Sequence, residues 1–151
     1  MAVKVVEGDL LQAEEDILGH QVNCQGVMGS GVARGIEERF PEVFTAYKSK
    51  CSSETSETLL GQCQIVRSQS GKYIANLFGQ DRFGKGTKFT QEEQLKGALM
   101  KLREFARSNG LSAALPYRIG SDRGGADWEA VYGMIEEVFK DDEVTLYKLK
   151  P

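Results

Sequence analysis

The side chains that could carry chemistry are few, and most of them stand in or beside glycine-rich segments. His20 is the only histidine of the chain, so any mechanism that needs an imidazole must use it. The three cysteines, Cys24, Cys51 and Cys63, are odd in number and form no CxxC pair. This pattern indicates neither a disulfide framework nor a cysteine zinc site. We therefore expect no metal and no cofactor.

Two glycine-rich segments have the form of a ligand-binding turn. Residues 23–33 leave an apolar strand and enter a helix, and residues 116–128 repeat this arrangement. Glycine lets the backbone approach a ligand closely, and the amides at the start of a helix attract anions. The first segment alone matches neither GxGxxG nor GxxxxGK[ST], and such turns are often glycine-rich for structural reasons. Two of them at the carboxyl ends of strands predict a crevice that could hold a diphosphate.

Strands and helices alternate along the chain, which predicts an α/β fold. Helices are expected at 31–40 with a restart at Pro41, after a capping box at Thr90–Glu93, and after Asp127 as cap. We expect surface loops at 52–61 and 78–88. Strands are expected at 3–6, 17–22, 64–67, 73–78, 113–116 and 144–147. Apolar strands at both ends of the chain and two amphipathic helices need a sheet with two covered faces, so the prediction is a three-layer α/β/α fold with a mixed central sheet.

Composition narrows the class of protein. A chain of 151 residues with 40% hydrophobic and 27% charged content suits one compact domain, residues 1–151. The net charge of −3 lacks the cationic excess of a general nucleic-acid binder. No apolar run approaches the roughly 18 residues of a membrane span, and the N-terminus does not resemble a signal peptide. We expect a cytoplasmic monomer without membrane contact.

Four segments in chain order resemble the macrodomains, a family whose members bind ADP-ribose. These are Gly8–Leu10, the loop 23–33, Asn76–Gln80 at the end of a strand, and the loop 120–128. The match covers essentially the whole chain. The combination of 22–31 with 124–128 is most similar to the small branch that includes ADP-ribose-1''-phosphate phosphatases and ADP-ribosyl hydrolases. The resemblance implies a macrodomain-like fold and ADP-ribose or ADP-ribose-1''-phosphate as the ligand, with ADP-ribosylated macromolecules as further partners.

The resemblance also implies a role for individual residues. Asp9 would accept a hydrogen bond from the adenine amino group, although it could instead cap a short helix. Asn23 would contact the distal ribose, although it could instead bond its own backbone as a turn residue. Phe78 and Phe83 could form part of the adenine or ribose wall, or both could be core or loop-anchor aromatics. The full set of implied ligand contacts is Asp9, Leu10, Asn23, Gln25, Met28, Gly29, Ser30, Gly31, Val32, Phe78, Gln80, Ser121, Asp122, Arg123, Gly124, Gly125 and Ala126.

For the chemistry, the resemblance leaves several alternatives open. One hydrolase group of the family uses a lysine of the middle loop with an aspartate of the last loop, but this chain has Gln80 and Asp81, and Gly124, at those places. His20 and Asp122, with Asn23 orienting the ribose, then form the candidate catalytic set, whereas a lone histidine on a strand can also be a core residue. A hydrolase, a non-catalytic reader of ADP-ribose and a binder of another nucleotide diphosphate are the three functions to separate.

Overall fold

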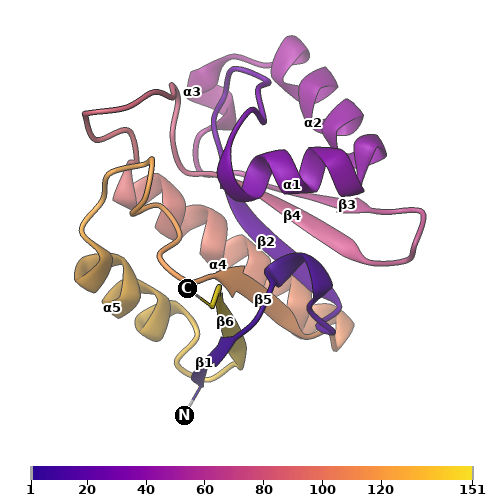
Figure 1. The fold of residues 1–151 in the computed structure, drawn as a ribbon, viewed down its shortest axis with the longest axis vertical. Helices are drawn as coiled ribbons and strands as arrows, with labels where there is room; N and C mark the ends of the chain where they lie inside the picture. Colours follow the sequence, from indigo (N-terminus) through magenta and orange to yellow (C-terminus); the bar gives the residue numbers. More distant parts are fainter. Residues whose placement is uncertain (1, 151) are drawn as a thin grey trace.

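A mixed sheet of six strands runs through the molecule (Figure 1) in the order β1-β6-β5-β2-β4-β3. The computed structural model describes residues 2–150. Only β3 is antiparallel to its neighbour, β4; the other neighbours are parallel. The predicted mixed sheet and the hairpin of β3 and β4 are therefore confirmed. The strands are β1 (Val3–Glu7), β2 (Ile17–Val22), β3 (Cys63–Arg67), β4 (Tyr73–Phe78), β5 (Ala113–Pro116) and β6 (Val144–Lys148).

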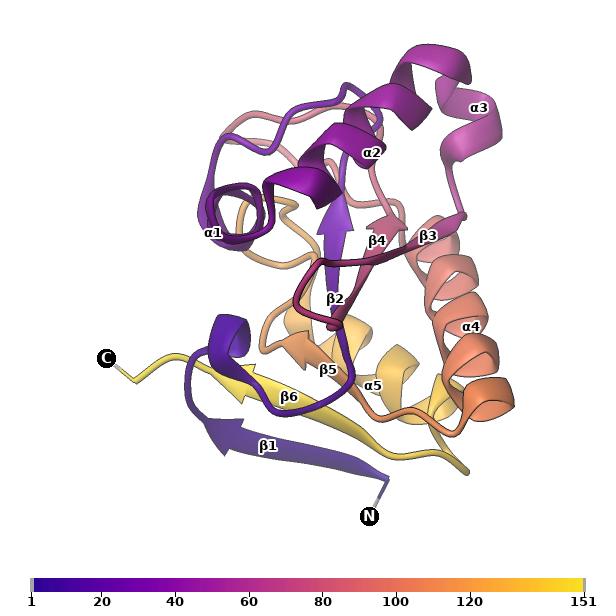
Figure 2. The ribbon, with the colours of Figure 1, turned by 90° about the vertical axis from the view of Figure 1, so that its right-hand side faces the viewer.

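Helices cover both faces of the sheet, which makes the three predicted layers (Figure 2). Helices α4 (Glu92–Asn109) and α5 (Trp128–Val138) pack on one face, and α1 (Gly31–Arg39) and α2 (Pro41–Ser53) pack on the other. Strand β2 contributes side chains to the hydrophobic cores on both faces of the sheet. Ile17 packs toward α4, while Leu18 and Val22 pack toward α2. Successive side chains of a strand point to opposite faces. His20 therefore lies on the face of α1 and α2, and Gln21 on the other.

The ends of the helices test the predicted caps. Asp127 accepts a hydrogen bond from the Ala130 amide as the N-cap of α5, and Gly110 ends α4 in the left-handed conformation with a φ of 64°; both were predicted. The capping box at Thr90 is wrong, because α4 has Gln91 as its N-cap without a side-chain bond, and the Thr90 hydroxyl donates to the Gly120 carbonyl instead. No helix within residues 2–150 is long and apolar enough to cross a membrane.

Two further expectations need correction. The polar segment 52–61 is mostly helical, because α2 extends to Ser53 and a short helix, α3 (Ser56–Leu59), follows. The Thr55 side chain caps α3, and Leu59 anchors it as a fully buried residue. The apolar run 3–6 predicted a strand of a buried sheet, but β1 lies at the edge of the sheet, where Lys4 and Val5 are exposed.

Parallel strands bring distant segments of the chain to one edge of the sheet. Strands β1, β2, β4, β5 and β6 all run in the same direction. Their carboxyl ends therefore lie together, and the segments that follow them, both glycine-rich loops included, meet there. In open α/β sheets this edge is where ligands bind.

Candidate functional site

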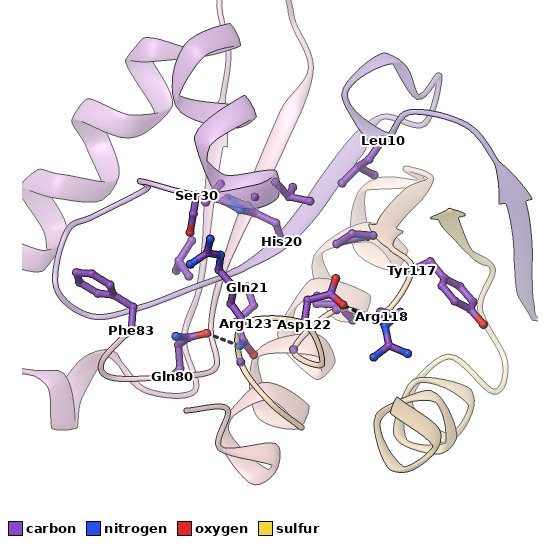
Figure 3. Close-up of a pocket in the computed structure, with 18 of the residues that line it drawn as sticks. Leu10, His20, Gln21, Ser30, Gln80, Phe83, Tyr117, Arg118, Asp122 and Arg123 are labelled. Carbon is purple, nitrogen blue, oxygen red and sulfur yellow. Dashed lines mark hydrogen bonds and ion pairs between the residues drawn. The ribbon is translucent and has the colours of Figure 1, made fainter. Parts of the chain in front are cut away.

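A cavity of about 990 Å³ opens at this edge (Figure 3). Its wall combines the turn after β1, the ends of β2 and β5, both glycine loops and the segment after β6. The two glycine loops thus line one cavity, as the sequence predicted, and contact of its residues with a ligand stays a prediction. The predicted site residues in the wall are Asp9, Leu10, His20, Asn23, Gly29, Ser30, Gly31, Val32, Gln80, Asp122, Arg123 and Gly124, together with Phe83.

Other predicted contacts lie outside the wall. Met28 and Phe78 are core residues, and Phe78 packs against Tyr47 with ring centroids 5.9 Å apart. Gln25 points away and donates to the Asp81 carboxylate at 2.9 Å. The remaining three belong to the second glycine loop but not to the cavity surface: Ser121, Gly125 and Ala126.

Asn23 is a turn residue as well as part of the wall. Its Nδ2 donates to the Val27 carbonyl at 2.9 Å, and its Oδ1 accepts from the Gln25 amide at 2.9 Å. The Tyr47 hydroxyl, from α2, lies 2.8 Å from the same Oδ1. The Asn23 side chain therefore holds the first glycine loop in shape and anchors it to α2. This is the local role that the sequence left open beside the ribose contact.

Asp9 also has a structural partner. Its Oδ1 accepts from the Leu11 amide at 3.0 Å as the N-cap of the short 3-10 helix Leu10–Gln12. The alternative that Asp9 caps a short helix is thus correct. A carboxylate has two oxygens, so the cap does not prevent the second one from accepting a bond from a ligand.

The charge partner predicted for His20 is engaged elsewhere. The Asp122 carboxylate pairs with the Arg118 guanidinium at 3.0 Å, with 72% of the Asp122 side chain exposed. Figure 3 shows this ion pair and places His20 away from it, on β2. The two predicted catalytic residues line the same cavity, but in residues 2–150 the structure gives no bond between them. Arg118 turns the chain out of β5 with a φ of 70°, a left-handed conformation that is uncommon outside glycine.

His20 is enclosed in the wall and uncharged near neutral pH. Only 1% of the residue is exposed. Burial lowers the pKa of His20 from its usual 6.5 to about 4, and the hydrogen bond to Asn76 offsets only part of that effect. Its Nε2 lies 2.7 Å from the Asn76 Oδ1, whereas Nδ1 is buried with no hydrogen-bond partner in the part of the chain that the structure describes. A neutral imidazole with a free nitrogen can act as a hydrogen-bond acceptor or a base.

The buried imidazole should make stability depend on pH. Below pH 6.5 the unfolded chain takes up a proton at His20 that the folded protein excludes until about pH 4. The free energy of unfolding should therefore fall as the pH drops through this window, by roughly 3 kcal/mol from this group at 1.36 kcal/mol per pKa unit. Urea unfolding between pH 7 and 4.5, compared with His20→Gln, isolates the contribution of the imidazole from that of the carboxylates. If the unfolding free energies of the wild type and of His20→Gln changed with pH in the same way, this contribution of the imidazole would be contradicted.

A polar cluster around Gln21 joins the loops, and sequence analysis did not predict it. The Gln21 Nε2 donates to the Gln80 Oε1 at 2.6 Å and to the Thr90 Oγ1 at 2.8 Å. Thr90 in turn donates to the Gly120 carbonyl at 2.7 Å, and its own amide donates to the Gly124 carbonyl. The cluster fastens the loop after β4 to the second glycine loop. A second polar residue, next to His20 in a strand of otherwise apolar residues, was the available signal.

Tyr117, Arg118 and Lys148 are further wall residues that sequence reasoning missed. The Tyr117 ring follows β5 and packs on Trp128 with centroids 4.9 Å apart, and the Lys148 ammonium lies 5.0 Å from its centroid. Tyr117, Arg118 and Lys148 all line the cavity. They give it an aromatic surface and two cations at one end. Their place directly after strand ends could have identified them.

Comparisons with known proteins agree with this geometry. The family model of the Macro domain matches residues 20–135. A DNA ADP-ribosyl glycohydrolase of Mycobacterium tuberculosis is 32% identical over 88% of this chain, although the chain spans only 37% of that relative. An ADP-ribose 1''-phosphate phosphatase of Meyerozyma guilliermondii is 30% identical over 53% of the chain and 54% of the relative.

Comparison with solved structures identifies the same family. The macrodomain of Mycobacterium tuberculosis DarG superposes with a TM-score of 0.83 at 30% identity and covers 96% of both chains. The chain therefore shares its overall fold with that macrodomain. The chain belongs to the Macro domain family.

Proposed function

We propose that this protein is a hydrolase that acts at the distal ribose of ADP-ribose derivatives. The substrate is ADP-ribose-1''-phosphate or ADP-ribose attached to a macromolecule. The observation that carries the proposal is the neutral His20, a residue of the wall of the cavity that both glycine loops line, whose buried Nδ1 has no partner within residues 2–150. The names of the relatives, a DNA ADP-ribosyl glycohydrolase and an ADP-ribose 1''-phosphate phosphatase, favour a hydrolase over a non-catalytic reader.

The cavity has the features that an ADP-ribose ligand requires. Loop amides and the cations Arg118 and Arg123 suit a diphosphate, since each supplies hydrogen-bond donors. The helix α1 begins at Gly31 in the wall, so its first amides add further donors. Asp9 lies in the wall after β1, where a carboxylate can accept from the adenine amino group. These positions orient the ligand with its distal ribose toward the first glycine loop and His20.

Water is the nucleophile in both versions of the reaction. In a phosphatase reaction, water attacks phosphorus and the bond between phosphorus and the 1''-oxygen breaks, which releases inorganic phosphate and ADP-ribose. In a glycohydrolase reaction, water attacks C1'' and the bond to the macromolecule breaks, which releases ADP-ribose. In either case a neutral His20 can accept the proton of the attacking water as general base. Asn23 holds the loop that presents the ribose.

A binding and turnover experiment tests the proposal. Calorimetry with ADP-ribose measures binding, and separate assays follow phosphate release from ADP-ribose-1''-phosphate and ADP-ribose release from ADP-ribosylated DNA and protein. We expect binding together with turnover of at least one substrate. Binding without any turnover would replace the hydrolase by the reader, and absence of binding would contradict both.

Substitution of Asp9 separates its two roles. Asp9→Ala should weaken ADP-ribose binding about fivefold to over a hundredfold, because a buried donor of the adenine would lose its acceptor at a cost of roughly 1–3 kcal/mol. Asp9→Asn is the matched control for folding, since asparagine caps helices as well as aspartate. It should keep the thermal stability of the wild type and still weaken binding, because its amide adds a donor opposite the adenine donor. Wild-type affinity in both variants would remove Asp9 from the binding site.

A further inference from the structure

His20 is the first member of a row of polar side chains that crosses three strands. In the sheet register, His20 of β2 faces Asn76 of β4, and Asn76 faces Gln64 of β3. The row lies on the face that α1 and α2 cover, among otherwise apolar side chains. Asn76 is fully buried. A buried polar row of this kind is stable only if its members satisfy one another.

Short contacts connect the members from the cavity to α2. The His20 Nε2 lies 2.7 Å from the Asn76 Oδ1. The Asn76 Nδ2 donates to the Gln64 Oε1 at 3.0 Å, and the Gln64 Nε2 donates to the Ala46 carbonyl of α2 at 3.2 Å. The row therefore ends on a main-chain group.

That end sets the direction of every hydrogen bond in the row. A carbonyl oxygen can only accept, so Gln64 must turn its NH₂ group toward Ala46 and its oxygen toward Asn76. Asn76 must then give its NH₂ group to Gln64 and its oxygen to His20. An oxygen facing Nε2 requires a hydrogen on Nε2. In a neutral imidazole this leaves Nδ1 with a free lone pair.

We propose that Asn76 and Gln64 are positioning residues that hold His20 as the Nε2–H tautomer, so that Nδ1 is the acceptor presented to the attacking water. The catalytic part of this inference rests on the proposed function; the tautomer does not. The buried Nδ1 without a partner in residues 2–150 is what such an arrangement leaves for a ligand or water. The lowered pKa of His20 keeps the imidazole neutral at the pH where it would act.

Charged groups on the neighbouring elements are occupied by other partners. On the cavity side, Asp9 caps its own helix and Asp122 pairs with Arg118. On α2, the Tyr47 hydroxyl bonds to Asn23. Within residues 2–150, no Asp, Glu, Lys or Arg side chain bonds to His20, Asn76 or Gln64. The protonation state of the imidazole therefore depends mainly on burial and on the row itself.

Because His20 is the only histidine, its imidazole can be observed without assignment ambiguity. Long-range ¹H–¹⁵N correlation spectra of the histidine-labelled protein at pH 7 should show Nε2 protonated and Nδ1 unprotonated. This measurement needs no substrate, so it stands even if the protein turns over none of the tested compounds. Protonation on Nδ1 in the wild type would overturn the inference.

Two variants of Gln64 test the direction of the hydrogen bonds in the row. Gln64→Glu can only accept from Asn76 and should keep the Nε2–H tautomer. A lysine at this position, Gln64→Lys, can only donate. The Asn76 oxygen would then turn toward the lysine and away from His20, which should move the imidazole proton to Nδ1. The longer side chain can be accommodated because Gln64 is only half-buried. The Lys variant should lose at least about tenfold in kcat with KM within about twofold, as expected for a base that acts only in the reacting complex. The same tautomer and the same kcat in both variants would overturn the proposal.

Asn76→Asp gives an independent readout. A carboxylate opposite Nε2 favours the imidazolium, so the pKa of His20 should rise by more than about one unit. The acid limb of the pH–rate profile should therefore shift to higher pH. The affinity for ADP-ribose at pH 8 should stay within about threefold. A merely structural residue would change stability and leave the acid limb in place, which would contradict the positioning role.

Discussion

Replacement of His20 by alanine should lower turnover by about 10²–10⁴-fold, the usual contribution of a general base. ADP-ribose affinity should stay within about threefold, because in the proposed reaction the imidazole acts at the reacting end of the ligand. The measurement is kcat on whichever substrate the wild type hydrolyses, with calorimetry for affinity.

Asn23→Ala should differ from His20→Ala by impairing both turnover and ADP-ribose affinity, since Asn23 shapes the first glycine loop before and during the reaction.

A second substitution guards against loss of folding. His20→Ala leaves the buried Asn76 oxygen without its donor, which costs about 1–3 kcal/mol of stability. His20→Gln offers an amide that can donate to Asn76 but cannot act as a base. We expect it to be as inactive as the alanine variant and more stable. Full activity in either folded variant would make His20 a core residue and leave the chemistry to Asp122, backbone amides and positioned water.

Gly124→Ala should disrupt the second glycine loop. A methyl group at Gly124 would overlap the Thr90 Oγ1 and lie 2.6 Å from the Gly120 carbonyl oxygen and 3.1 Å from the Gln21 Nε2. These atoms form the cluster that fastens the loops, so the methyl group must break it or displace the loop. We expect a loss of about 1–3 kcal/mol in unfolding free energy, and at least about tenfold weaker ADP-ribose binding.

Gly133 in α5 is the matched control for this substitution. A methyl group there would meet nothing within 4 Å. Gly133→Ala should therefore stabilise the protein by about 0.8–1 kcal/mol through helix propensity, with unchanged ligand binding and turnover. Equal changes in unfolding free energy and in ligand binding for Gly124→Ala and Gly133→Ala would show that crowding at Gly124 does not determine either quantity. The same crowding explains why an aspartate, which the resemblance places there in one hydrolase group, does not fit this loop.

The sequence predicted the layered fold and the meeting of the two glycine loops because both follow from local patterns. Alternation of strands and helices indicates parallel strands, and parallel strands place the loops that follow them at one edge. The Asp127 cap and the Gly110 stop are likewise decided by a few neighbouring residues. These two helix ends were therefore predicted correctly.

The errors about side-chain partners lie where another residue competes for the same polar group. The segment at Thr90 has the spacing of a capping box, but Gly120 and Gln21 use its hydroxyl. Asp122 was expected beside His20, yet Arg118, four positions earlier in its own loop, binds it. The partners of His20 and Gln21 belong to other strands and loops and leave no periodic pattern in the sequence. Such networks become visible only when the strands are aligned.

The row of His20, Asn76 and Gln64 also restricts how the sheet can assemble. Side chains alternate along a strand, so a slip of β4 by one residue would move every side chain of that strand to the opposite face. Asn76 would then enter the apolar core beneath α4, and His20 and Gln64 would each lose a buried partner. Misaligned pairings of β2, β4 and β3 therefore carry three unsatisfied polar groups. The residues that set the proton on the imidazole thereby also select the correct strand alignment during folding.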